Sequence, residues 1–188
     1  MIKKQFSIKS MILCAIFTSL TAIGAFIRIP VPMVPFTLQF LFTMLAGLLL
    51  GGKRGSISVL LYIILGLLGL PIFAEGGGLA YILKPSFGYL IGFCVSTLVI
   101  GKVGRDSPIP SFKRLLIANF IGLFIVYLFG MAYYWLISTF YLGTGIGLWP
   151  LFLYCFLLAV PGDIVLCILA AILAKRLIPV LHNLKLEV

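Results

Sequence analysis

Residues 157–166 read LLAVPGDIVL and place an acid, Asp163, inside the last long apolar run of the chain. A charged side chain at the centre of a bilayer costs about 2.5–3.5 kcal/mol even on lenient insertion scales, so such residues usually face a cavity or a partner. Pro161 and Gly162 loosen the helix here, because proline lacks a backbone donor and glycine leaves space unfilled. The stretch predicts a polar gap, which survives at membrane depth only inside protein or around a polar ligand.

The composition places this run in a membrane. Of the 188 residues, 63% are hydrophobic and 10% are charged, and the mean hydropathy is +1.27. Such a chain has too little polar surface for a soluble globule. We expect a multi-pass protein of the cell membrane in which residues 1–188 form a single transmembrane domain. The net charge of +10 does not indicate nucleic acid as a partner, because the basic residues lie in short clusters at the ends of apolar runs.

The apolar runs predict an all-α membrane protein with six transmembrane helices in one bundle. The expected ranges are about 8–28, 37–51, 55–70, 85–101, 112–138 and 150–178. The second and third are short, so they cross tilted or do not reach the full thickness of the bilayer. With six crossings, twelve of the fourteen Lys and Arg residues lie on one face, and only Arg28 and Lys84 lie on the other. The positive-inside rule then makes both termini cytoplasmic.

Two outer connections, residues 29–37 and 71–84, are expected to cover a pocket. The first contains three prolines, so it resists helix formation and favours an extended, ordered segment. It is also apolar, which fits a lid over a pocket better than a solvated connector. The second carries Glu75, the one acid of the outer loops, followed by three consecutive glycines. These glycines permit close backbone approach or movement.

Asp163 is the leading candidate for a ligand contact. The alternative is structural, with main-chain groups freed near Pro161 satisfying its carboxylate. Arg28 and Lys84 flank the outer loops, where each is either an anchor that reaches the lipid headgroups or a partner for the carboxylate of an anionic substrate. Gln39 follows the prolines and either caps the second helix or hydrogen-bonds a ligand. These alternatives stay open at the level of sequence.

Enzymatic and nucleotide-binding readings find little support. Residues 47–54 nearly match a P-loop, but Arg54 stands where the magnesium-binding serine or threonine belongs, so energy from ATP must come from another chain. The one histidine, His182, lies in the polar tail, and one intramembrane acid is too few for an aspartyl protease. The four cysteines lie in apolar runs without a CxxC pair, which argues against disulfides and metal binding. We expect no enzyme, no cofactor and no metal site, which leaves a solute-binding membrane subunit.

Several segments, taken together and in order, resemble one known family over essentially the whole chain. They are Ile29–Pro32 with Pro35–Gln39, Leu48–Gly51 with Arg54–Gly55, Gly66–Phe73, Pro85 with Gly88–Phe93, and Pro161–Asp163. The chain resembles BioY, the biotin-specific substrate-binding S component of energy-coupling factor (ECF) transporters. The family pattern has a lysine three residues after the aspartate, where this chain has Leu166, and often threonine-glycine where it reads Ser86-Phe87.

The resemblance implies a six-helix S component that binds biotin at the outer side. Asp163 would accept hydrogen bonds from the ureido N–H groups, aromatic surfaces would enclose the rings, and Lys84 or Arg28 would meet the tail carboxylate. The expected substrate-binding residues are Asp163, Lys84, Gln39, Arg28, Tyr89, Phe36 and Glu75.

The resemblance also implies protein partners, namely a transmembrane coupling protein, EcfT, and two ATPases. A strip of small residues on the first helix, Ala15, Ser19 and Ala22, would dock the coupling protein, because small residues let another helix approach closely. Two other functions remain open. The chain could be an S component for another vitamin, or a membrane structural or assembly subunit in which Asp163 serves folding alone.

Overall fold

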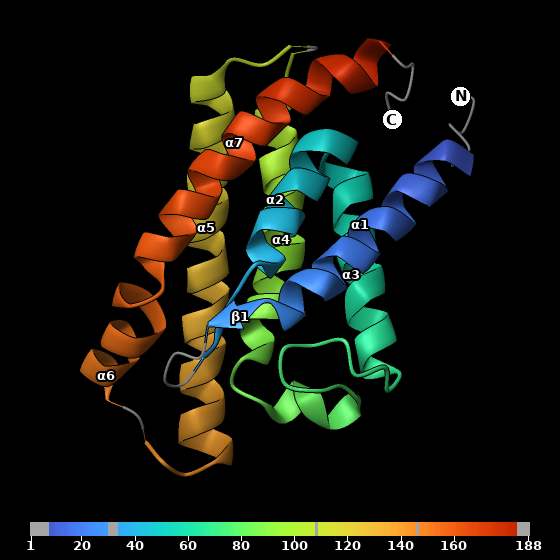
Figure 1. The fold of residues 1–188 in the computed structure, drawn as a ribbon. Coiled ribbons are helices and arrows are strands. Elements are labelled where there is room, and N and C mark those ends of the chain that lie inside the picture. Colours follow the sequence, from blue (N-terminus) through green and yellow to red (C-terminus); the bar gives the residue numbers. More distant parts are fainter. Residues whose placement is uncertain (1–7, 30–33, 108, 146, 184–188) are drawn as a thin grey trace, which may run out of the picture.

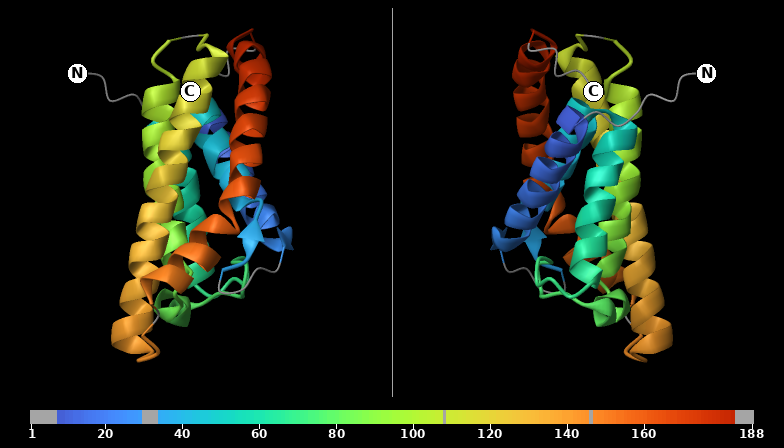
Figure 2. Two further views of the ribbon diagram at one scale, coloured as in Figure 1. Left: turned by 90° about the vertical axis from the view of Figure 1, so that its left-hand side faces the viewer. Right: turned by 90° about the vertical axis from the view of Figure 1, so that its right-hand side faces the viewer.

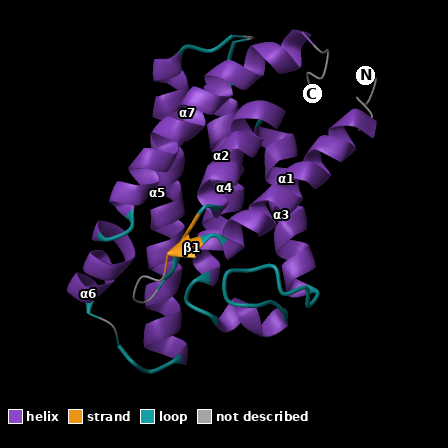
Figure 3. Ribbon diagram, viewed as in Figure 1, coloured by secondary structure: helices purple, strands orange, loops and turns teal. Residues whose placement is uncertain are grey.

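The computed structural model describes residues 8–29, 34–107, 109–145 and 147–183, which are mostly helical (Figure 3). The longer helices are α1 (Ile8–Phe26), α2 (Gln39–Leu50), α3 (Gly52–Leu67), α4 (Phe87–Gly104), α5 (Phe112–Leu136) and α7 (Val160–Asn183). The shorter elements are β1 (Arg28–Ile29), β2 (Phe36–Thr37), the 3-10 helix η1 (Leu79–Leu83), the π-helices η2 (Ile137–Tyr141) and η3 (Leu153–Leu157), and α6 (Leu148–Phe152). Each predicted range overlaps one of the longer helices, with ends that mostly differ by a few residues, so the predicted order of helices is confirmed.

Four segments of the described chain are long and apolar enough to cross a membrane. They are Ile8–Phe26, Phe87–Gly104, Phe112–Tyr141 and Trp149–His182. α2 has 12 residues and α3 has 16, as the sequence predicts. At 1.5 Å per residue α2 is about 18 Å long, against a hydrocarbon core of about 30 Å. The fold is therefore that of a multi-pass membrane protein with four full-length candidate spans and two shorter helices beside them.

The two ends of the bundle are formed by different elements. The start of α1 and the end of α7 lie at one end, and the β1–β2 hairpin and the loop that contains η1 lie toward the other (Figures 1 and 2). Both termini of the described bundle therefore leave on the same side. We refer to the hairpin side as the outer end, after the orientation that the charge pattern of the sequence predicts.

α4 lies against α2, α3 and α5 and approaches its neighbours through glycines. A Cβ atom added at Gly101 would lie 2.2 Å from the backbone nitrogen of Gly52 in α3. On the other side, a Cβ at Gly92 would lie 3.0 Å from the Cα of Val126 in α5. Helices can come this close only where side chains are absent. The glycine spacing of α4 thus serves packing within the chain.

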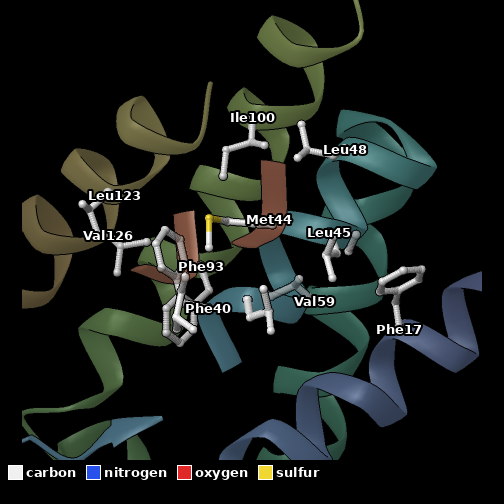
Figure 4. Packing of buried hydrophobic residues seen from close by; sticks show 14 of the residues in the cluster. Phe17, Phe40, Met44, Leu45, Leu48, Val59, Phe93, Ile100, Leu123 and Val126 are labelled. Carbon is white, nitrogen blue, oxygen red and sulfur yellow. The ribbon is translucent and has the colours of Figure 1, made fainter. Parts of the chain in front are cut away.

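The apolar core is centred on α2 and α4 and extends to α1, α3 and α5 (Figure 4), and buried residues of α7 also belong to it. Met44 and Leu48 of α2 and Ile100 of α4 are completely buried. Nearer the outer end, the rings of Phe40 and Phe93 stack with their centroids 5.9 Å apart. Both rings also line the cavity described below, so the core forms its floor.

The proline-rich segment before α2 is extended where it is described. Arg28 pairs with Thr37 and Ile29 with Phe36 in an antiparallel register, and residues 30–33 lie outside the described residues. The backbone N–H of Leu38 donates to carbonyl oxygens of α1 and of the residue that follows it. The hairpin is thereby fixed to the end of α1 and the start of α2.

The run predicted as one helix over residues 150–178 is one candidate span, Trp149–His182, but it is not a regular helix, because it is divided into α6, η3 and α7. The irregularity expected at Pro161 lies a few residues earlier. The N–H of Leu158 donates to Leu153 and that of Ala159 to Phe156, spacings of five and three residues in place of four. Pro161 itself occupies the first turn of α7, where a missing N–H costs no helical hydrogen bond. Asp163 therefore enters the bundle at a helix start.

Candidate ligand-binding site

A cavity lies at the outer end, between the β1–β2 hairpin, the loop that contains η1, α4, α5, η3 and the start of α7. The space between these elements, counted together with the open solvent at its mouth, is about 670 Å³. Most of its lining is apolar or aromatic, with a few polar groups among these surfaces. The lining includes Phe36, Gln39, Tyr81, Tyr89, Tyr127 and Asp163. Such a site encloses flat apolar rings and orients them through few hydrogen bonds.

Asp163 supplies the acid of the cavity. Its side chain is 8% exposed, and the hydroxyl of Tyr127 in α5 donates to its Oδ2 at 2.5 Å. Among the described residues, the structure gives its other oxygen, Oδ1, no hydrogen bond. Asp163 also lies in the first turn of α7, where the helix dipole favours a negative charge. The carboxylate is thus held on one side by a phenol and keeps an acceptor for a ligand on the other.

Gln39 is the second polar group of the cavity and is 3% exposed. Its Oε1 accepts from the Thr37 hydroxyl at 3.1 Å, and its Nε2 donates to the hydroxyl of Tyr62 at 2.6 Å. Tyr62 in turn donates to the backbone oxygen of Ile72 at 3.0 Å. Leu38, and not Gln39, occupies the cap position of α2, and no side chain caps that helix end. The network ties the hairpin to α3 and to the loop after it, and one amide hydrogen and one lone pair of Gln39 remain for a ligand.

Two glycines make room for aromatic rings of the cavity. A Cβ at Gly162 would lie 2.7 Å from the ring of Phe36, so the hairpin can rest on α7 immediately beside Asp163. A Cβ at Gly130 in α5 would lie 2.5 Å from the ring of Tyr89. The proline-glycine-aspartate sequence therefore has a packing role as well as a chemical one, because its glycine admits the lid.

The aromatic walls are held edge to face. The ring centroids of Tyr89 and Tyr127 are 6.0 Å apart with an interplanar angle of 87°, and those of Tyr127 and Phe156 are 5.1 Å apart at 74°. Such pairs contribute about 0.5–1.5 kcal/mol each beyond the area they bury. Tyr89 also donates to the backbone oxygen of Cys155 at 3.3 Å. The ring that holds Asp163 is itself fixed from both sides.

Three charged side chains gather at the rim of the cavity. Lys84 Nζ lies 3.5 Å from Glu75 Oε2 and donates to the Glu75 backbone oxygen at 3.1 Å. Arg28 donates to the backbone oxygen of Ala74. The three charged residues are absent from the described lining, whereas Ala74 and Tyr81 belong to it. The basic residues that the sequence singles out therefore stand at the mouth, and not within the cavity.

Tyr81 connects this rim to the interior. Its ring lies 5.1 Å from Lys84 Nζ and 4.5 Å, between centroids, from the buried ring of Phe73. Burial raises the pKa of the Tyr81 hydroxyl above its ordinary value. A tyrosine hydroxyl is protonated at neutral pH in any case, so this one can donate to a ligand.

The structure thus brings together four of the predicted site residues, Asp163, Gln39, Tyr89 and Phe36, and places the other three at the rim. Sequence reasoning missed Tyr127. A signal existed, since a tyrosine in the middle of a long apolar run, away from the interfacial aromatic belt, needs a partner for its hydroxyl.

The small-residue strip of α1 lies apart from the cavity. Ala15 and Ser19 are exposed and Ala22 is half-buried. Two neighbouring threonines face the opposite way, and the hydroxyl of one of them, Thr18, donates to the backbone oxygen of Ser58 at 2.8 Å. α1 therefore has an inner face that is bonded to α3 and an outward face of small and aliphatic side chains.

Comparisons with known proteins agree with this geometry. Residues 1–183 match the BioY family. A probable biotin transporter BioY from Lysinibacillus sphaericus is 45% identical over 180 residues, which cover 96% of this chain and 92% of the relative. One from Pyrococcus horikoshii is 39% identical over 90% of this chain and 96% of its own length.

A solved structure is similar as well. The S component for biotin from an ECF-type ABC transporter is 31% identical, with a TM-score of 0.68 over 94% of both chains. The family match covers nearly the whole sequence, and the similarity in structure covers the whole bundle. This chain belongs to the BioY family.

Proposed function

We propose that this chain is the biotin-binding S component of an ECF-type transporter, which captures biotin at its outer end and delivers it by association with an ATP-driven coupling module. The observation that carries the proposal is the position of Asp163, a buried acid with an available oxygen in a cavity at the outer end. The similarity to biotin transporters and to an S component for biotin supports the choice of ligand.

The cavity suits the chemistry of biotin. The vitamin has a ureido ring with two N–H donors and a carbonyl, a sulfur-containing ring, and an apolar tail that ends in a carboxylate. Asp163 Oδ1 accepts from one of the ureido N–H groups, a charge-assisted bond that gains strength where water is excluded. Tyr89 and Phe36 enclose the fused rings, and the spare groups of Gln39 are available to the ureido carbonyl.

The tail of the ligand then points to the mouth. Leu166, which stands where the family pattern has a lysine, is an apolar side chain with 6% exposure and offers no charge. Lys84 and Arg28 at the rim remain as partners for the carboxylate. A carboxylate near the mouth keeps part of its hydration. Binding it at the rim therefore avoids most of the desolvation free energy that a buried carboxylate would cost.

For the whole chain we propose one transmembrane substrate-binding domain with six crossings and both termini in the cytoplasm. The common exit of both termini from the bundle supports an even number of crossings. α2 and α3 are short enough to require tilt or a locally thinner bilayer. The excess of Lys and Arg at the end where the termini leave supports the orientation.

Energy comes from partner subunits in this proposal. The near P-loop at residues 47–54 lies across the end of α2 and the start of α3, and it lacks the strand and the hydroxyl residue that nucleotide binding requires. A coupling protein of the EcfT type docks on the outward face of α1 around Ala15 and Ser19, where small side chains permit close helix contact. Two ATPases complete the transporter.

The purified protein is expected to carry its ligand. We predict that native mass spectrometry of the protein in mild detergent shows a bound mass that matches biotin and disappears after denaturation. Another bound vitamin would assign the chain to a different substrate. Absence of any ligand, together with no binding of added biotin, would favour a structural or assembly subunit.

Replacing the buried acid is expected to weaken binding. We predict that Asp163→Asn lowers the affinity for biotin at least tenfold, which is about 1.4 kcal/mol, because the amide loses the charge and offers one acceptor to the Tyr127 hydroxyl or to the ligand. Titration calorimetry on the folded variant measures the effect. Asp106→Asn, on the exposed acid paired with Arg114, is the matched control and should bind like the parent. An unchanged affinity of folded Asp163→Asn would remove the carboxylate from the site.

Blocking the outward face of α1 is expected to separate binding from transport. We predict that Ala15→Trp keeps biotin affinity within about twofold but lowers uptake at least tenfold in cells that contain the coupling protein and the ATPases, because the indole prevents close helix contact. Ile121→Trp, on the exposed face of α5, is the matched control and should transport normally. Full uptake by Ala15→Trp would exclude α1 from docking.

A further inference from the structure

The rim of the cavity already contains a carboxylate. Glu75 Oε2 lies 3.5 Å from Lys84 Nζ, and the same nitrogen donates to the Glu75 backbone oxygen at 3.1 Å. Glu75 and Asp163 are the two acids of the outer half, and only Glu75 is paired with a cation. The amine that could receive an anionic ligand is therefore occupied by an acid of the protein.

The pair is positioned where a ligand held at Asp163 would end. Asp163, Ala74 and Tyr81 all line the same cavity. Ala74 is the neighbour of Glu75 in sequence, and the ring of Tyr81 lies 5.1 Å from Lys84 Nζ. A molecule that fills the cavity from the acid outward brings its far end to the Lys84–Glu75 pair.

The ion pair between Lys84 and Glu75 also costs little free energy to break, so Lys84 can change its partner. The side chains of Lys84 and Glu75 are 43% and 38% exposed, and ion pairs in such settings contribute little, because water screens them and ordering two long side chains costs entropy. Arg28, bonded to the backbone oxygen of Ala74, holds the same loop independently. Release of Glu75 therefore leaves the loop attached to the hairpin.

We infer that Glu75 acts as an internal substitute for the ligand carboxylate: it occupies Lys84 while the cavity is empty, and an incoming carboxylate takes its place. The inference rests on the proposed binding of a carboxylate-bearing vitamin and goes beyond it by naming a residue that sets selectivity at the mouth. Glu75 keeps the lysine neutralised in the empty state, so only a ligand that brings its own carboxylate recovers the ion pair. Neutral analogues gain nothing from Lys84.

The test compares biotin with biotin amide, which keeps the ureido ring and loses the charge. We expect Glu75→Gln to raise the affinity for biotin at least threefold and to change the affinity for the amide less than twofold, both measured by calorimetry. In a Lys84→Gln background, the same Glu75→Gln change should have no further effect on the affinity for biotin. The amine for which the Glu75 and biotin carboxylates compete is then absent.

Other results would overturn the inference. If Glu75→Gln weakens both ligands alike, Glu75 only orders the loop. If Glu75→Gln still raises the affinity for biotin in the Lys84→Gln background, Glu75 acts through the electrostatic potential of the rim. It does not then compete with the biotin carboxylate for Lys84. If neither ligand binds the parent protein, the proposed function fails instead, which separates the two claims.

Discussion

A phenol and a carboxylate meet inside an apolar bundle, and the site depends on this contact between Tyr127 and Asp163. One hydrogen bond satisfies half of a buried carboxylate, and burying the rest is costly unless a further donor arrives. The surrounding side chains hold the carboxylate and its phenol partner in place. Gly162 admits the ring of Phe36 beside the acid, and Tyr89 and Phe156 fix the orientation of Tyr127. A ligand that donates one N–H to Oδ1 completes the hydrogen bonding.

The bundle combines a tightly packed interior with an open outer end. Glycines bring α4 against α3 and α5 at backbone distance, and close packing of this kind resists deformation. The outer end is built instead from a two-stranded hairpin and a glycine-rich loop, joined through Gln39, Tyr62 and Arg28. Loops on a rigid scaffold can open for a ligand without disturbing the helices. The outward face of α1 stays separate, so docking of a partner need not disturb the cavity.

Much of the fold and part of the site could be predicted from the sequence, because a bilayer restricts which residues and which secondary structure can cross it. Apolar runs locate the helices, their lengths identify α2 and α3 as short, and the prolines predict an extended segment, which the structure pairs into a hairpin. A lone acid in an apolar run predicts a cavity beside Asp163. The pairing of Tyr127 with it depends on how α5 and α7 pack, which periodicity does not specify. The irregularity of the last run is predicted at Pro161 but lies a few residues earlier, because proline in a first turn fits a regular helix. The Lys84–Glu75 pair depends on the course of a loop.

A structure of the protein with bound biotin tests the central claim most directly. The account predicts that the ureido nitrogens lie in the cavity at the outer end, with one of them 2.7–3.2 Å from Asp163 Oδ1, a normal hydrogen-bond distance, while Tyr127 keeps its bond to Oδ2. Biotin bound elsewhere, or bound in the cavity with the Asp163 carboxylate satisfied by protein groups alone, would contradict it.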